Sequence, residues 1–185
     1  MWWIWVVVGV VVVLVLWVVA TYNRLVGLRE AVRNAWAQID VLLKRRYDLI
    51  PNLVETVKGY AAHEKGTLEA VIAARNAAMS APNDVAARSA AEGALSGAVR
   101  QLFAVAEAYP NLKADQSFLQ LQNELADTEN RISGQRGSYN NVVQQFNTTV
   151  MSIPTNLIAG PFGFTTQPFF ELQDPGQREA PKVKF

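Results

Sequence analysis

The hydrophobic pattern of this chain begins with an uninterrupted apolar run. The first twenty positions carry no charged side chain, and the stretch from Trp2 to Ala20 is apolar apart from Gly9. A helix rises about 1.5 Å per residue, so this stretch covers about 28 Å, close to the roughly 30 Å hydrocarbon core of a bilayer. The pattern predicts a membrane-spanning helix over residues 1–21.

A cleaved signal peptide is the alternative interpretation of such a start. Signal peptides usually have a positively charged beginning, an apolar run of roughly 7 to 15 residues and small residues at the cleavage site. Here no Lys or Arg precedes the run, the run is longer, and it ends in VVATYN. We therefore expect a retained anchor. Because Arg24, Arg29 and Arg33 follow it, the positive-inside rule predicts an outside N-terminus and a cytoplasmic remainder.

Beyond the span, apolar residues recur at alternating spacings of four and three, which is typical of helices that pack at a shallow angle. The first series runs through Val32, Trp36, Ile39, Leu43, Arg46, Ile50, Leu53, Val57 and Tyr60. Only Arg46 breaks it. The phase is unchanged at Pro51, which predicts one long helix with a kink there, continuing from the anchor without a hinge and extending weakly to about Ser80.

Two more helices are predicted. Residues 81–84, Ala-Pro-Asn-Asp, stop the first helix and offer a cap for a helix over 85–108. That helix carries small residues every four positions, which favours a close helix contact: Ser89, Gly93 and Gly97. A turn at 109–111 precedes a third long helix, from about Ala114 to before Pro154.

Residues 154–185 are rich in proline and phenylalanine and predict an extended tail. In a solvated tail its phenylalanines would expose a large apolar surface: Phe162, Phe164, Phe169 and Phe170. We expect 155–172 to pack in a groove of the helical domain or on a neighbouring subunit, and 173–185 to be loose. Nearby asparagines predict hydrogen bonds that hold the tail: Asn140, Asn141, Asn147 and Asn156.

Composition excludes several functions. With no cysteine, the chain has no disulfide, thiolate nucleophile or cysteine-held metal. Its 17 basic and 16 acidic residues are spread along the chain and give a net charge of +1, so no basic field for nucleic acid is evident.

Catalytic motifs are also missing from the sequence. His63 is the only histidine; Thr67 stands where HExxH needs a second histidine, and Tyr60 stands where a di-iron ExxH motif needs glutamate. No GxSxG, GxxxxGK[ST] or GxGxxG pattern occurs. We expect no enzyme activity, no cofactor and no metal. An all-carboxylate site using Glu124, Asp127 and Glu129 stays open as an alternative.

Charges in or beside the apolar stripes are more informative. Arg46 lies in the first stripe, while Glu129, Arg131 and Arg136 flank the third. A buried unpaired charge costs several kcal/mol, so we expect these residues to pair between helices or to face another subunit. The candidate interaction or register residues are Arg46, Glu129, Arg131, Arg136, Asn147, Phe162, Phe164, Phe169 and Phe170.

Several segments between residue 22 and about residue 170 together resemble one known family. They read YNRLVGLREAVRNAWAQIDVLLKRRYDLIPNLVETVKGYAAHE, AYPNLKAD, LQNELADTENRI, RGSYNNVVQQFN and IPTNLIAG. They are similar to the LemA family of bacterial membrane proteins. The resemblance implies a single N-terminal span, an antiparallel bundle of long helices, no recognised catalytic centre, and association with copies of itself or with other membrane proteins.

The expected fold is therefore all-α: a transmembrane helix (1–21) continuous with an antiparallel bundle of long helices (22–153), followed by an extended tail (154–185). The expected function is that of a non-enzymatic, single-pass scaffold in the bacterial cytoplasmic membrane. It would contact lipid through its span and self-associate or organise another membrane protein, without binding nucleic acid. The alternatives are a membrane-shaping or lipid-organising protein, and a carboxylate-metal accessory protein.

Overall fold

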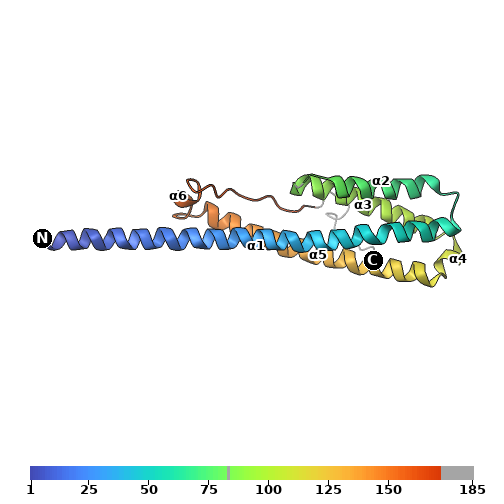
Figure 1. The fold of residues 1–185 in the computed structure, drawn as a ribbon, viewed down its shortest axis with the longest axis horizontal. Coiled ribbons are helices and arrows are strands. Elements are labelled where there is room, and N and C mark those ends of the chain that lie inside the picture. Colours follow the sequence, from blue (N-terminus) through green and yellow to red (C-terminus); the bar gives the residue numbers. More distant parts are fainter. Residues whose placement is uncertain (83, 172–185) are drawn as a thin grey trace, which may run out of the picture. The chain divides into compact units, whose positions relative to one another are not determined.

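A computed structural model describes residues 1–82 and 84–171, and all regular structure in them is helical (Figure 1). The all-α prediction is thus confirmed. In chain order the helices are α1 (Trp2–Tyr60), α2 (Lys65–Ser80), α3 (Val85–Ala106), α4 (Pro110–Lys113), α5 (Gln116–Met151) and α6 (Asn156–Ala159). Contacts divide the chain into two units. The first comprises Met1–Gln38 and Gln135–Phe169; the second comprises Ile39–Gly134 with Phe170 and Glu171.

Helix α1 is a single helix with Pro51 inside it. Every residue from Met1 to Leu16 is exposed. Among the described residues α1 is the one helix long and apolar enough to cross a membrane. Burial begins directly after the apolar run, at Thr21 (8% exposed) and Leu25 (0%).

The expectation that the first long helix extends to about Ser80 is wrong. Helix α1 ends at Tyr60, and a turn closed by the Glu64 amide donating to the Ala61 carbonyl (3.0 Å) separates it from α2. Gly59 lowers the helix propensity just before this turn, while the buried Ala61 holds the turn against the core. His63 is exposed in the turn.

Helices α3 and α5 begin at Val85 and Gln116, close to the predicted starts, whereas the short α4 lies where a turn was predicted. The Asp84 carboxylate accepts a hydrogen bond from the Ala87 amide (2.9 Å) and caps α3, as predicted. The close helix contact predicted at Gly93 and Gly97 is absent, because a methyl group at either position would meet no described atom within 4 Å. Helix α3 instead buries a different set of residues: Ser89, Glu92, Leu95, Val99, Leu102 and Ala106.

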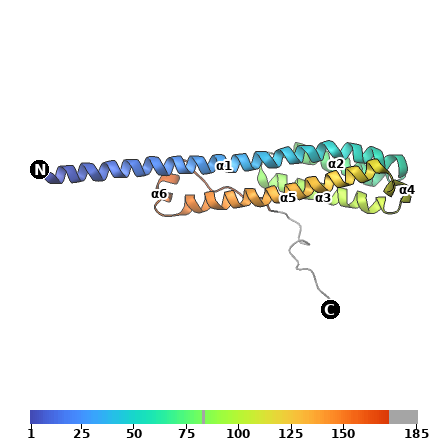
Figure 2. The ribbon, with the colours of Figure 1, turned by 90° about the horizontal axis from the view of Figure 1, so that it is seen from below.

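The first unit packs α1 against the last part of α5, α6 and the chain that follows α6 (Figure 2). Trp36 lies 5.5 Å from Tyr139 between ring centroids, whereas Tyr22 lies 5.2 Å from Phe162. Earlier positions on α1 thus contact later positions in the chain, and Figure 2 shows this part of α1 and the last part of α5 running antiparallel. The buried apolar residues are Leu25, Val32, Ala35, Tyr139, Val143, Phe146, Val150, Ile158, Ala159 and Phe164.

The second unit contains the C-terminal part of α1, α2, α3, α4 and the first part of α5. Its core includes the α1 positions that the sequence pattern placed on one face: Ile39, Leu43, Arg46, Ile50, Leu53 and Val57, each at most 2% exposed. The other helices contribute further buried apolar residues: Leu68, Val71, Ala78, Leu95, Val99, Leu102, Ala106, Leu112, Phe118, Leu125 and Ile132. The second unit thus has its own hydrophobic core, which also contains two buried charged residues, Arg46 and Glu92.

Candidate functional site

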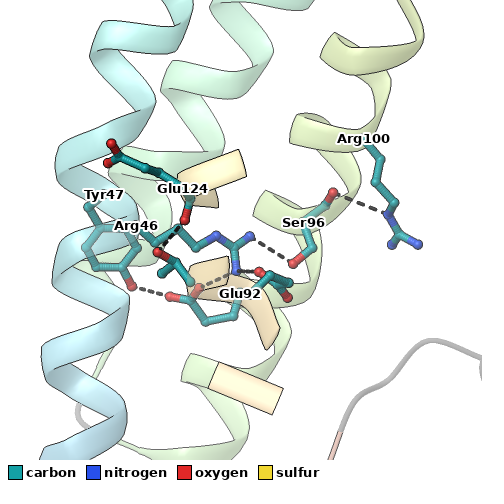
Figure 3. A network of polar contacts seen from close by, with 8 residues as sticks. Arg46, Tyr47, Glu92, Ser96, Arg100 and Glu124 are labelled. Atoms are coloured by element: carbon teal, nitrogen blue, oxygen red, sulfur yellow. Dashed lines mark hydrogen bonds and ion pairs between the residues drawn. The ribbon is translucent and has the colours of Figure 1, made fainter. Parts of the chain in front are cut away.

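A buried ion network occupies the core of the second unit, and Arg46 of α1 is at its centre (Figure 3). The Arg46 guanidinium lies 3.4 Å from a carboxylate oxygen of Glu92 on α3 and 3.0 Å from one of Glu129 on α5. It also donates a hydrogen bond to the Ser96 hydroxyl (2.8 Å). One cation therefore joins three helices.

Burial makes this network expensive to disrupt. Arg46 is 2% exposed and Glu92 is 0% exposed, whereas 43% of the Glu129 side chain reaches solvent. Two charges taken out of water are tolerated only when they are paired and hydrogen-bonded, and removing one partner of such a pair costs about 3 to 5 kcal/mol. The network therefore favours one register of α1, α3 and α5.

Tyr47, next to Arg46, adds a second contact to the buried carboxylate. Its hydroxyl donates a hydrogen bond to Glu92 Oε1, as Figure 3 shows. Burial raises the pKa of the Tyr47 hydroxyl well above its ordinary value, and the negative charge of Glu92 raises it further, while Arg88 opposes the shift. Tyr47 therefore remains a neutral hydrogen-bond donor at physiological pH.

Two further arginines connect neighbouring helices to α1. Arg88 of α3 lies 3.5 Å from the Asp40 carboxylate, and Arg75 of α2 donates through Nε to the Tyr47 carbonyl (2.7 Å). These contacts surround the ion network with links to the same stretch of α1, so the charged groups in this part of the second unit serve to connect helices.

Two tyrosines of the second unit connect the end of α1 and the turn that follows it with the segments on either side of α4. The Tyr60 hydroxyl donates to Asp115 (2.9 Å), and the Tyr109 hydroxyl donates to Glu64 (3.1 Å). Asp115 also accepts a hydrogen bond from the Phe118 amide at the start of α5 (2.9 Å). Both hydrogen bonds lower the pKa of Asp115, and the one from Phe118 has the larger effect. The carboxylates here again have structural partners.

The carboxylates considered for a metal site do not come together. Asp127 pairs with Arg131 at 2.9 Å, Glu129 pairs with Arg46, and Glu124 accepts from Gln120 at 3.0 Å. No group of three or more His, Cys, Asp or Glu in residues 1–82 and 84–171 is arranged to hold a metal ion.

A hollow in the second unit is small compared with a ligand pocket. It has a volume of about 40 Å³ and is lined by residues of α3, α4 and α5: Phe103, Ala106, Glu107, Lys113, Phe118, Leu119 and Gln122. Ligand pockets usually measure about 300 to 1,000 Å³, so this hollow admits a few water molecules.

In the first unit, the chain after α6 runs back along α5 and is held by side chains of that helix. Asn147 makes two hydrogen bonds with the Gln167 backbone. Its Nδ2 donates to the Gln167 carbonyl (2.8 Å), and its Oδ1 accepts from the Gln167 amide (2.7 Å). The Tyr139 hydroxyl donates to the Pro168 carbonyl (3.0 Å). These are contacts within one chain of the kind that the sequence predicted for Asn147.

The four tail phenylalanines have different environments. Phe164 is 3% exposed, contacts Tyr22 edge-on and lies under the Arg29 guanidinium, which is 5.0 Å from the ring centroid. Phe170 is also buried, in the second unit, whereas Phe162 (53%) and Phe169 (42%) are exposed. In the second unit, the Glu171 carbonyl accepts from the Ser89 hydroxyl. The predicted loose segment 173–185 lies outside the described residues.

The predicted register residues on α5 differ in what they contact. Glu129 pairs with another helix, as expected, but Arg131 pairs with Asp127 four residues earlier on the same helix. Both members of that pair are exposed, at 61% and 50% of their side chains, so Arg131 does not pair between helices; that it faces another subunit stays a prediction. Arg136 is buried in the first unit (6% exposed).

Sequence reasoning missed Glu92 and Tyr47. A signal for Glu92 was present, because it lies three residues before Leu95, on the stripe that continues through Val99 and Leu102. Reading this position as a second charge in a stripe would have identified a partner for Arg46. Tyr47 carries no such signal, since it lies beside the stripe.

Comparison with known proteins adds a family. The sequence profile of the LemA family matches residues 35–185. The chain is 24% identical to magnetosome proteins MamQ 1 and MamQ 2 of Paramagnetospirillum magneticum, over 84% of this chain and 66% of each relative. It is 27% identical to protein LemA of Metamycoplasma hominis, over 74% of this chain and 63% of that protein. The chain thus spans just under two thirds of the length of these curated relatives.

Proposed function

Because the chain belongs to the LemA family, we propose that it is a non-enzymatic, single-pass membrane scaffold that self-associates or organises a membrane partner through its helical domain. One observation carries the proposal. Helix α1 is apolar and exposed from Trp2 to Leu16, and the same helix continues into the packed parts of the chain. A membrane anchor and a helical domain therefore share one helix.

The exposed apolar start requires a nonaqueous environment. Trp2, Trp5 and Val13 are 78%, 77% and 64% exposed, and in water each would leave a large apolar surface hydrated. The run is long enough to cross a bilayer, and a helix satisfies its own backbone hydrogen bonds there. The arginines at 24, 29 and 33 favour the cytoplasmic side for the rest of the chain.

The chemistry of the second unit supports a scaffold over an enzyme. Buried Arg46 and Tyr47 both contact the buried carboxylate of Glu92, and Glu129 and Asp40 pair with arginines. Groups used in this way stabilise a helix arrangement and leave no donor or acceptor directed into a substrate-sized cavity among the contacts described above. Such a domain is suited to presenting surfaces to partners.

A mass measurement tests self-association. The full chain, purified in mild detergent and exchanged into lipid nanodiscs, should give a particle mass corresponding to several copies. Gly93 and Gly97 offer a matched variant, because a Cβ at either position would meet no described atom within 4 Å outside the adjacent backbone of α3, and circular dichroism checks that the variant folds. Replacing both with Leu should lower the copy number if this face joins copies.

The opposite result would be equally clear. A strictly monomeric parent chain at working concentration would remove the self-association half of the proposal. The partner half would then rest on native purification from membranes, followed by particle imaging of the captured assembly. A chain recovered alone in both experiments would overturn the scaffold proposal as a whole.

A further inference from the structure

A cluster of exposed apolar side chains lies where α5 turns into α6. Four residues between positions 151 and 162 are more exposed than a core residue would be, at 62%, 83%, 71% and 53%: Met151, Ile153, Leu157 and Phe162. We refer to these four residues as the apolar corner. Large apolar side chains concentrated in so short a segment mark a contact surface and not a solvated turn.

The apolar corner lies beside the point where α1 leaves its apolar run. Phe162 contacts Tyr22 edge-on at 5.2 Å between ring centroids, and Tyr22 comes two residues after Ala20. Helix α6 lies beside α1 in both views (Figures 1 and 2). All of these residues belong to the first unit. The corner is therefore at the level where a spanning α1 would emerge from the bilayer.

Charge distribution matches a lipid surface at this level. No charged residue occurs from Gly137 to Phe170, so the segment containing the corner carries no charged side chain whose dehydration would oppose insertion. On α1, by contrast, the residues just beyond the span include Arg24, Arg29 and Arg33, which suit the phosphates of lipid headgroups. The acid nearby, Glu30, pairs with Arg33 at 2.9 Å.

We propose that the apolar corner inserts into the headgroup and acyl-chain boundary of the leaflet from which α1 emerges. The chain would then contact the same bilayer twice, through the span and through the turn between α5 and α6. This inference rests on the proposed membrane span. Lipid is the occupant that the structure favours, because the corner lacks charge and its Phe162 contacts Tyr22, which directly follows the span on α1.

Site-specific fluorescence in liposomes tests this contact. The chain has no native cysteine, so a single cysteine at Leu157, labelled with an environment-sensitive dye, reports on the corner alone. The full chain is reconstituted in phosphatidylcholine and phosphatidylglycerol vesicles containing lipids with a shallow spin-label quencher, and a deep spin-label quencher is used for the control near the centre of the span. Two controls are Val11→Cys within the apolar run and Asn141→Cys, which is exposed on α5 about 15 Å before Met151 along the helix.

We expect the dye at Leu157 to be quenched by the shallow spin-labelled lipid at least threefold more than the dye at Asn141, and to be shielded from aqueous iodide. The exposed position of Leu157 means that labelling leaves the core intact, which circular dichroism verifies. A dye at Leu157 that behaves like the one at Asn141, while the dye at Val11 is quenched, would overturn the corner contact and leave the span standing.

Two other outcomes separate the remaining explanations. If the dyes at Val11 and Leu157 both escape lipid quenching, the membrane span itself fails, and the proposed function fails with it. If the dye at Leu157 is shielded from iodide but not quenched by lipid, a second copy of the chain covers the corner, and the lipid contact is refuted.

Discussion

Replacing Arg46 with Met would measure how strongly the buried ion network joins α1, α3 and α5. The variant preserves an unbranched side chain of similar length but removes the guanidinium that lies 3.4 Å from Glu92 and 3.0 Å from Glu129. Glu92, at 0% exposure, would then keep its charge in the core without that partner. Breaking a buried pair costs about 3 to 5 kcal/mol, so a loss near 4 kcal/mol would change the ratio of folded to unfolded chain about a thousandfold.

Urea unfolding of the full chain in mild detergent, followed by far-ultraviolet circular dichroism, gives the free energy of unfolding. Arg131→Met is the matched control, because Arg131 also pairs with a carboxylate at 2.9 Å, but on the exposed face of α5. Solvent screening limits that pair to about 0.5 kcal/mol. Adding Glu92→Gln to Arg46→Met should recover at least about 1 kcal/mol, because it removes the stranded charge.

The reasoning would be refuted if Arg46→Met and Arg131→Met differed by less than about 1 kcal/mol, since the burial of Arg46 would then carry no energetic weight. A double variant less stable than Arg46→Met would refute the second step, because the cost would then not come from the loss of Arg46 beside the Glu92 carboxylate.

Three further predictions concern hydrogen bonds and titration. Asn147→Ala removes two hydrogen bonds to the tail backbone, so it should lower the free energy of unfolding by about 1 to 3 kcal/mol and speed limited proteolysis of the C-terminus. The control Asn141→Ala, at an exposed position, should do neither. Equal cleavage rates for the two variants would contradict this prediction. Burial raises the pKa of Tyr47, so the contribution of Tyr47 to the free energy of unfolding is complete below the ordinary tyrosine pKa of about 10 and is lost at higher pH. Urea unfolding at a series of alkaline pH values should therefore show a shallower decline of stability for Tyr47→Phe than for the parent chain. An equal decline with pH would count against the contact. The Phe118 amide lowers the pKa of Asp115, so the stability that Asp115 contributes above an ordinary aspartate pKa of about 4 is lost as pH falls through the lower folded value. The melting temperature of Asp115→Asn should therefore change less with acid pH than that of the parent chain. An unchanged pH dependence would argue against the hydrogen bond from the Phe118 amide.

The long stripes of the sequence predicted much of the helical core. Leu43, Ile50 and Val57 lie seven residues apart, and each is completely buried in the second unit. Arg46 was recognised as a register residue because a charge in such a stripe must find a partner. The Asp84 cap was also predictable, because capping depends on residues within one turn of each other.

Other features depend on tertiary packing that periodicity does not encode. Leu68 and Val71 continue the helical pattern beyond Tyr60, but a period counts residues without indicating that the chain reverses direction. The pairing of Arg46 with Glu92 joins positions 46 residues apart and requires α1 and α3 to be side by side. Glu92 was also hard to identify as the partner of Arg46 from the sequence, because α3 is rich in alanine and several of its faces are therefore compatible with burial.

The division of contacts has a consequence for the order in which the chain folds during synthesis. The second unit takes nearly all of its described residues from one continuous stretch, Ile39–Gly134, so its contacts can form while later residues are still being added. The first unit pairs Trp36 with Tyr139 and Tyr22 with Phe162, across more than a hundred residues. Closing such long loops is slow compared with forming local contacts. The part of α1 next to the apolar run therefore waits for its partners until the stretch Gln135–Phe169 has been added.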